Sequence, residues 1–190
     1  MADHRVLVTG ARPWKRPDII AAAFASVQPT GRPVLVHGQC DPQHPDTRKP
    51  IPWELAKRVS WEVQGRYWGA DWLSEWVVIN QRLGWVIERH PAQWARCGRG
   101  AGFLRNSDMA GLGAAECHAF LAAAYRNAGS LDCAVKAYRA GIPTTCWCDA
   151  CGPGALNAPC EEHSLDEVRA TWRRKVASPS PALWHGRMQR

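Results

Sequence analysis

The chain has 190 residues, enough for one full-sized domain with a buried core and a small appendage. Hydrophobic residues make up 46% of it and charged residues 22%, a balance that excludes an intrinsically disordered protein. The formal charge of +7 favours an anionic partner such as a nucleotide, a phosphate or a nucleic acid, with a solvated basic surface as the alternative.

The N-terminal segment 1–14 (MADHRVLVTGARPW) is too polar for a secretory signal peptide. No stretch approaches the roughly 18 apolar residues of a membrane helix. We therefore expect a cytoplasmic protein without membrane contact. In a reducing compartment the eight cysteines are expected to be thiols or metal ligands rather than disulfides.

The first 38 residues predict a strand, a helix and a second strand. The β-branched run His4–Thr9 ends at Gly10, and Pro17–Val27 has a proline near its start followed by apolar residues at helical spacing. Residues 34–37 (VLVH) read as a strand closed by Gly38. This spacing predicts a βαβ unit with parallel strands.

The alternation continues along the chain after a proline-rich, charged loop at 39–52. In order, the patterns predict helices at Trp53–Gln64 and Ala70–Leu83, a strand at 85–87, a glycine-rich loop at 90–102, a helix around Phe103–Leu112, a strand at Cys117–Leu121, a loop and helix within 127–143, and a strand at Ile142–Cys146. Together they predict an α/β fold with a Rossmann-like, doubly wound parallel sheet over residues 1–145.

Residues 146–190 have a different character and predict a small extension with a C-terminal helix. Four cysteines and a histidine fall within eighteen residues, at the paired spacing of a structural zinc site. The candidate ligands are Cys148, Cys151, Cys160 and His163, with Cys146 as a fifth. Four protein ligands would close the coordination shell, so this zinc would be structural. The alternative is a set of buried, reduced thiols.

Ligands of open α/β sheets bind outside the carboxyl ends of the strands. Four segments of this chain are expected to meet there, namely 9–14 (TGARPW), 36–38 (VHG), 99–106 and 129–130. In the first of them, Gly10 permits close backbone approach, Arg12 offers a planar fork for phosphate, and Trp14 offers a face for a base. The glycine and serine at 129–130 suit either an ordinary helix cap or a phosphate site.

Several of these motifs, in their order and spacing, resemble an uncharacterised bacterial and phage branch of the SLOG superfamily, a Rossmann-like group. They are TGARPW, VHG, GAD at Gly69–Asp71, HPAQW, GRGAGFLRNSDM and NAGSLDCAVKAYRAGIP, and they cover most of residues 4–143. The superfamily includes the Lonely-guy phosphoribohydrolases, the DNA-processing protein DprA and predicted sensors of nucleotide messengers. The resemblance therefore implies a nucleotide-binding protein, often a homodimer.

The resemblance also implies roles for residues of the last motif. The glycine and threonine that hold a phosphate in the Lonely-guy proteins fall on Gly129 and Ser130, and their arginine falls on Arg105. Their catalytic glutamate falls on Cys133. Asp132 is the nearest acid, but one residue rotates a helical side chain by roughly 100°. The missing carboxylate argues against hydrolysis and leaves phosphate binding intact.

The expected site combines these residues. Candidate ligand-binding residues are Gly10, Arg12, Trp14, His37, Gly38, Asp71, Asn106, Gly129 and Ser130, and candidate catalytic residues are Arg105 and Asp132. The expected ligand is a nucleoside monophosphate, NAD or an ADP-ribose-like compound. The protein would be a sensor or sequestering protein, or an N-glycosidic phosphoribohydrolase. The alternative is a DprA-like nucleic-acid-binding module.

Residues 39–68 form an insertion relative to the resembled branch, where the loop after VHG runs almost directly into GAD. The insertion carries three tryptophans and a mixture of basic and acidic residues. We hypothesise that it forms a lid or a dimer contact over the site. The alternative is a surface helix without a role in binding.

Overall fold

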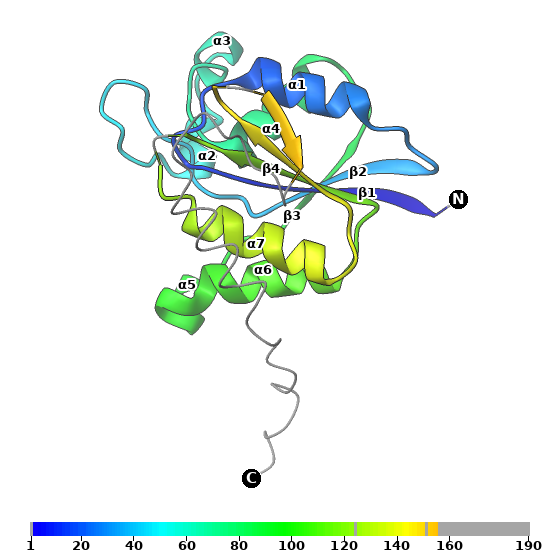
Figure 1. Ribbon diagram of the computed structural model, residues 1–190. Coiled ribbons are helices and arrows are strands. Elements are labelled where there is room, and N and C mark those ends of the chain that lie inside the picture. Colours follow the sequence, from blue (N-terminus) through cyan, green and yellow to red (C-terminus); the bar gives the residue numbers. More distant parts are fainter. Residues whose placement is uncertain (1, 124, 151, 156–190) are drawn as a thin grey trace.

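One six-stranded sheet, in the order β3-β2-β1-β4-β5-β6, organises the computed structural model, which describes residues 2–123, 125–150 and 152–155 (Figure 1). The strands are β1 (Asp3–Gly10), β2 (Arg32–His37), β3 (Val86–Arg89), β4 (Glu116–Leu121), β5 (Thr144–Cys148) and β6 (Gly152–Ala155). The first five are parallel, and β6 pairs antiparallel to β5. The predicted α/β fold with a parallel sheet is confirmed, and the strand order reverses between β1 and β4.

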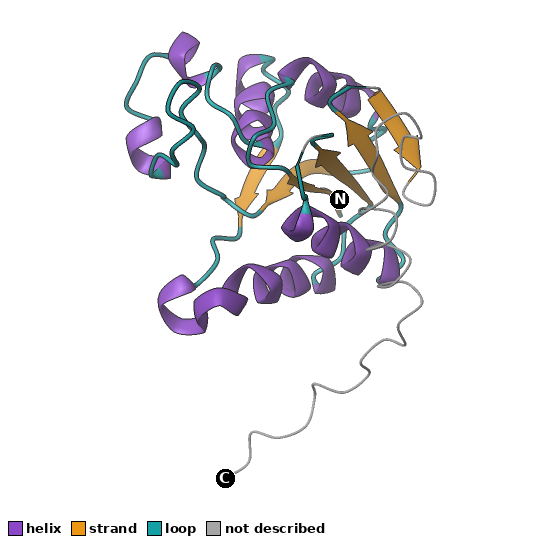
Figure 2. Ribbon diagram, turned by 60° about the vertical axis from the view of Figure 1, so that its left-hand side comes forward, coloured by secondary structure: helices purple, strands orange, loops and turns teal. Residues whose placement is uncertain are grey.

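Helices cover both faces of the sheet (Figure 2). On one face α1 (Pro17–Ser26) packs beside α4 (Ala70–Asn80), and on the other α6 (Ala101–Gly111) packs beside α7 (Ala128–Arg139). The shorter elements are α2 (Trp53–Ala56), α3 (Trp61–Gln64), α5 (Trp94–Cys97) and the 3-10 helix η1 (Gly98–Gly100). Within the part of the chain that the structure describes, no helix is both long and apolar enough to cross a lipid bilayer.

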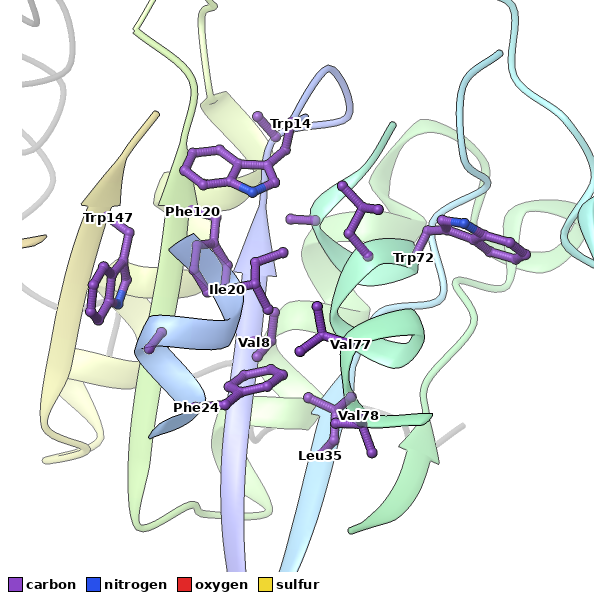
Figure 3. Close-up of a cluster of buried hydrophobic side chains, with 14 of the residues drawn as sticks. Val8, Trp14, Ile20, Phe24, Leu35, Trp72, Val77, Val78, Phe120 and Trp147 are labelled. Atoms are coloured by element: carbon purple, nitrogen blue, oxygen red, sulfur yellow. The ribbon is translucent and has the colours of Figure 1, made fainter. Parts of the chain in front are cut away.

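The larger part of the core lies between the sheet and the α1–α4 layer (Figure 3). Val8, Leu35 and Phe120 project from the strands and meet Ile20 of α1 and Val77 of α4, all of them buried. A second cluster, which includes Leu7, Val34, Val36, Met109 and Cys133, fills the opposite face. Strands that are buried on both faces need continuous apolar runs, and VLV occurs in both β1 and β2 for this reason.

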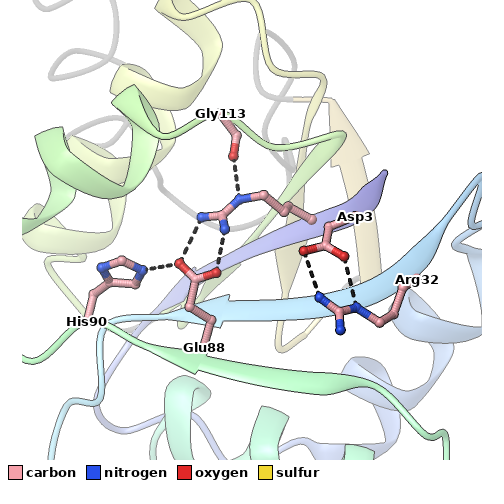
Figure 4. A network of polar contacts seen from close by, with 6 residues as sticks. Asp3, Arg32, Glu88, His90 and Gly113 are labelled. Carbon is pink, nitrogen blue, oxygen red and sulfur yellow. Dashed lines mark hydrogen bonds and ion pairs between the residues drawn. The ribbon is translucent and has the colours of Figure 1, made fainter. Parts of the chain in front are cut away.

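Ion pairs join the ends of strands that are distant in sequence (Figure 4). Arg5 donates through Nε to the Gly113 carbonyl (2.9 Å) and through Nη2 to Glu88 Oε1 (2.9 Å). The ring of His90 contacts the same carboxylate. Burial opposes ionisation of Glu88, but the hydrogen bonds from Arg5 and His90 outweigh it and lower the pKa of this carboxyl group. The network therefore ties β1 to the edge strand β3.

The single helix predicted at Trp53–Gln64 is wrong, because the chain forms two four-residue helices with a break between them. Ser60 is extended (φ −61°, ψ 158°) and starts α3. The Gln64 amide donates to the carbonyls of Lys57 (3.3 Å) and Val59 (2.9 Å), which a continuous helix would have bonded internally. The amphipathic spacing is present in the sequence, but at the break the Gln64 side chain supplies the hydrogen bonds that these carbonyls would otherwise lack.

The end of the sheet also differs from the sequence prediction. The fifth strand runs over Thr144–Cys148 rather than Ile142–Cys146, and it continues past the expected start of the extension at 146. The antiparallel strand β6 was not predicted, because Gly-Pro-Gly-Ala lacks the residues that favour strands. The predicted C-terminal helix lies outside the described residues.

The insertion at 39–68 packs against α4. Trp53 and Tyr67 of the insertion are buried against Trp72 of α4, with ring centroids 4.9 and 6.1 Å apart. The Trp72 indole in turn donates to the Gln64 carbonyl (2.9 Å). Aromatic area that is removed from water here fixes the insertion to the flank of the sheet.

A buried carboxylate, Glu75 of α4, binds the insertion to the sheet. Its oxygens accept from Lys57 Nζ of the insertion (2.9 Å) and from Arg89 Nε of β3 (2.8 Å), and one lies 3.4 Å from His37 Nε2 of β2. Burial alone would raise the pKa of Glu75, but the nearby His37 ring and the hydrogen bonds from Arg89 and Lys57 lower it well below the ordinary value. Glu75 is therefore an ionised hub that joins three elements.

We predict that Glu75→Gln lowers the free energy of unfolding at pH 7 by about 2 to 3 kcal/mol. This is less than for a fully buried pair, because the Lys57 and Arg89 side chains remain about a third exposed. The folded-state pKa is depressed, so the stabilisation is present above the unfolded pKa of about 4.3 and is lost as the pH falls further. Urea unfolding followed by tryptophan fluorescence, at pH 7 and pH 4, measures both effects. Glu54→Gln, at an exposed position of α2, is the control, and equal stability of the two variants at pH 7 would contradict the role of Glu75.

Candidate functional site

A cavity of about 490 Å³ opens at the carboxyl ends of β1, β2 and β4. Its lining includes Thr9, Gly10, Gly38, Asp71, Asn106 and Ser130. These residues come from the end of β1, the loop after β2, the first turn of α4, the middle of α6 and the start of α7. The cavity thus lies where the strand order reverses, the ordinary ligand site of an open α/β sheet, and its volume suits a small molecule.

The charge of the lining is strongly positive. Among the described residues that line the cavity, the cationic ones are Arg12, Arg99, Arg105 and Arg126, and the one carboxylate is Asp71. Of the arginines, Arg105 is partly buried and the others are exposed. Guanidinium groups bind phosphates and carboxylates through paired hydrogen bonds, so this lining favours an anionic ligand.

Arg105 of α6 crosses directly over Gly38. Its Nη1 donates to the carbonyls of Gly38 and of His90 (3.3 Å), and its Nε donates to Asn106 Oδ1 (2.9 Å). A Cβ atom at position 38 would lie 1.7 Å from the guanidinium, so a larger residue there would move Arg105 from this position. These acceptors are uncharged, which leaves the positive charge of Arg105 to act on the cavity.

The start of α7 faces the cavity through Ala128, Gly129 and Ser130. Within the described residues, no side chain caps this helix, and a Cβ at Gly129 would meet no atom within 4 Å. The first N–H groups of a helix have no partner within it and carry partial positive charge. An uncapped helix start that opens on a cavity can therefore bind an anion.

Asn127, which the sequence interpretation did not single out, holds this turn in place. It adopts a left-handed conformation (φ 49°). Its side chain accepts the Ala122 N–H (3.1 Å) and donates to the Ala122 carbonyl (2.8 Å), so it clamps the loop between β4 and α7. Asparagine directly before Ala-Gly-Ser was the available signal, since asparagine tolerates the left-handed region better than most residues.

Asn106 and Asp132 form a layer behind the start of α7. Asn106 Nδ2 donates to the Gly129 carbonyl and to Asp132 Oδ2, both at 3.1 Å. Lys136 Nζ, one turn along α7, lies 2.8 Å from the same carboxylate oxygen. Asp132 is absent from the described lining of the cavity, so the candidate acid supports the helix rather than facing a ligand.

Two predicted ligand-binding residues, Trp14 and His37, do not line the cavity. Trp14 has no exposed surface, packs on Phe120 with ring centroids 5.3 Å apart, and donates through Nε1 to the Arg16 carbonyl. His37 is equally buried, and its ring stacks on Trp53 of the insertion. The hydrophobic effect draws both rings into the core, so the expectation that Trp14 offers its face to a base is wrong.

Gly10 lines the cavity but has a different role from the predicted one. A Cβ at this position would lie 2.3 Å from Ala70 Cβ and 2.9 Å from the Phe120 carbonyl oxygen. The glycine is therefore required for close packing of α4 and β4 around β1. Arg12, two residues further, does reach the lining as predicted from the sequence.

The thiols near the cavity are poor nucleophiles. Burial raises the pKa of Cys40 to about 11, although Arg105 partly offsets this, and it raises the pKa of Cys133 to about 12. Both groups are therefore protonated at neutral pH. Cys133 packs in the core with Leu7, Val36 and Met109.

The rim of the cavity carries aromatic residues that the sequence interpretation missed. Trp94, Phe103 and Tyr125 line the cavity and are 53%, 47% and 44% exposed. Arg99 and Arg126 lie on the same rim. Exposed aromatic rings beside guanidinium groups are suited to stacking on a planar, anionic ligand. The interleaved Trp, Arg and Phe of residues 94–103 were the available signal.

The insertion contributes only Cys40 to the described lining of the cavity. The lid hypothesis for residues 39–68 is therefore not supported, because the aromatic residues of the insertion are used in packing on α4. The insertion instead helps to form a second hollow of about 220 Å³ beside Trp61, Trp72 and Trp76.

The expected zinc site falls largely outside the described residues, which exclude Cys151, Cys160 and His163. Cys146 is buried in a cluster with Leu121 and Leu131. Cys148 ends β5, and its Sγ accepts the Ala150 N–H at 3.5 Å. No group of three or more metal-binding side chains occurs within the described part of the chain.

Comparison with known proteins gives one significant relative in the curated set. The chain is 31% identical over 143 residues to the Gene 61 protein of Mycobacterium phage D29, and the alignment covers 74% of this chain and 93% of the phage protein. No family model matches the chain, and no solved structure matches it significantly. The chain belongs to the same family as the phage protein.

Proposed function

We propose that this member of the phage Gene 61 family binds a nucleotide-derived ligand, with a phosphate of the ligand at the N-terminus of α7. One observation carries the proposal: an uncapped helix start opens on the same cavity as four arginines, at the reversal of strand order. The open space at Gly129 leaves room for a phosphate to approach the backbone.

The ligand we propose is a nucleoside monophosphate, NAD or an ADP-ribose-like compound. The cavity volume of about 490 Å³ is within the usual range for small-molecule sites. The aromatic rim supplies a stacking surface for a base, a role that the buried Trp14 cannot fill. The motifs in common with the SLOG superfamily are consistent with this, and we propose that the chain is a cytoplasmic member of that superfamily.

Binding is a better-supported activity than hydrolysis. An N-glycosidic phosphoribohydrolase needs a carboxylate at the reacting sugar. Cys133 occupies the matching position as a buried thiol, and Asp132 is held by Asn106 and Lys136 behind the cavity wall. We therefore propose a sensor or a sequestering protein in place of an enzyme.

We also propose that the protein forms a homodimer. Leu104 of α6 and Leu112, the residue directly after this helix, are 54% and 59% exposed. Burial of these two side chains against a second copy would remove their apolar area from water.

We predict that Gly129→Ala weakens the binding of AMP about tenfold or more, or roughly 1.4 kcal/mol, because the new methyl group occupies the space proposed for the phosphate. The melting temperature should stay the same or rise, since alanine is favoured over glycine within a helix by about 1 kcal/mol. Isothermal titration calorimetry with AMP, NAD and ADP-ribose measures the affinity. Gly111→Ala, in open space on α6, is the matched control. Unchanged affinity in Gly129→Ala, or binding of none of the three compounds by the wild type, would refute the proposal.

A nucleic-acid-binding module is the second candidate, favoured by the exposed Trp94, Phe103 and Tyr125 next to Arg99 and Arg126. The dependence of affinity on salt separates the two. One bound nucleotide should give a shallow slope of log affinity against log salt, of about −1 to −2, whereas a strand that contacts several phosphates gives a steep one. Fluorescence anisotropy with labelled AMP and a labelled single-stranded oligonucleotide, from 50 to about 300 mM salt, makes the comparison. A tight oligonucleotide complex with a steep slope favours the second candidate.

We propose that the C-terminal extension binds one structural zinc ion through Cys148, Cys151, Cys160 and His163. Cys146 is a weaker candidate because it packs in the hydrophobic core. In the described part of the proposed site, the Ala150 N–H donates to Cys148 Sγ.

Protein purified without chelator should contain about one zinc per chain by plasma mass spectrometry. The double variant Cys148→Ser, Cys160→Ser should lose the metal. Cys97→Ser, at the last residue of α5 and far in sequence from the cluster, should retain it. A zinc content well below one per chain in the wild type would contradict the proposal.

A further inference from the structure

We propose that Asp71 makes the cavity selective for a ligand with a sugar hydroxyl next to its phosphate, that is, a ribonucleotide in preference to its deoxy counterparts. The inference rests on the proposed function and specifies the ligand of that same cavity. It arises from the one described carboxylate in a lining that is otherwise basic.

Asp71 is a buried side chain with an incomplete set of partners. It lies in the first turn of α4, lines the cavity and is 6% exposed. Its Oδ2 accepts the Cys40 N–H at 3.0 Å, and no other hydrogen bond reaches it from the described residues. A carboxylate accepts about four hydrogen bonds, so the side of Asp71 that faces the cavity needs a donor. A buried acceptor without a donor destabilises the site.

The position of Asp71 next to cations defines what the donor must be. Cys40 contacts both Asp71 and Arg105, because its N–H donates to Asp71 and its Sγ lies 3.7 Å from Arg105 Nη2. A phosphate would be attracted by Arg105 and the start of α7 but repelled by Asp71. The ligand therefore presents an anionic group and, a few ångströms away, a neutral donor that turns toward the carboxylate.

A sugar phosphate has this combination of groups. A ribose hydroxyl donates to a carboxylate and lies near the phosphate, whereas the amino group of adenine, the other neutral donor of AMP, lies at the far end of the base. A site that is built to hydrogen-bond a hydroxyl rejects an analogue without it strongly, because its buried polar group is then left unpaired. Asp71 thus acts as a specificity residue, and it has no chemical step of its own.

The test compares AMP, 2′-deoxy-AMP, 3′-deoxy-AMP and inorganic phosphate by isothermal titration calorimetry. The wild type should bind at least one of the deoxy compounds about tenfold or more weakly than AMP. In Asp71→Asn this difference should shrink to within about threefold, since a neutral amide is a weaker acceptor. Inorganic phosphate should bind the variant as tightly as the wild type or more tightly, because the repulsion is removed. A purely structural role of Asp71 would weaken all four probes together.

Asp108→Asn, which removes an exposed carboxylate from α6, is the matched control and should keep the preference for AMP. Equal binding of AMP and both deoxy compounds by the wild type would overturn the inference while leaving the proposed function intact. Binding of none of the nucleotides would overturn both. If Asp71→Asn fails to fold, the selectivity of the wild type among the three nucleotides still decides the question.

Discussion

Hydrogen bonding of β1 to parallel partners on both sides is the constraint on which the site depends. β1 pairs with β2 on one side and with β4 on the other. The chain leaves β1 toward the face covered by α1, and it leaves β4 toward the opposite face, covered by α7. The connections after β1 and β4 therefore diverge above the strand ends, and a crevice remains between them. All other features of the cavity occupy positions that this pairing creates. The tight packing at Gly10, where a Cβ would collide with Ala70 and Phe120, keeps the strands and α4 close enough to form its floor.

Electrostatics then give the crevice its chemical character. Arg105 is held by uncharged acceptors and keeps its charge for the cavity, and the free amides of α7 add to the same field. Asp71 is the one negatively charged side chain among the described residues of this otherwise positively charged lining. A second buried carboxylate, Glu75, has a structural role, since Lys57, Arg89 and His37 surround it and it joins the insertion to the sheet. Two carboxylates of one helix thus differ in role because of their partners.

The aromatic residues show how far composition can mislead. The chain has eleven tryptophans, a residue type that suits wet pockets and interfaces as well as a core. Trp14, Trp53 and Trp72 are buried and hold α4, the insertion and the first loop together. Trp94, which was not among the predicted site residues, lines the cavity at its rim. A tryptophan in a loop after a strand is drawn inward when the sheet face beneath it is apolar, and the sequence alone does not show which face that is.

The residues alone determined the α/β class, the parallel pairing and the segments that meet at the strand ends. Those features follow from apolar runs, helical spacing and turn residues, which act over a few positions and leave a local signature. Only the tertiary structure decided which side chains enter the cavity, because that depends on how the helices rotate and pack on the sheet. Asp132 and Cys133 illustrate this: on one turn of α7 the acid points to Asn106 and Lys136 while the thiol enters the core. The broken helix at 53–64 and the short strand β6 depend instead on particular neighbouring contacts, namely the Gln64 amide on the Lys57 and Val59 carbonyls and the pairing of β6 with β5, which helical spacing and strand propensity do not show.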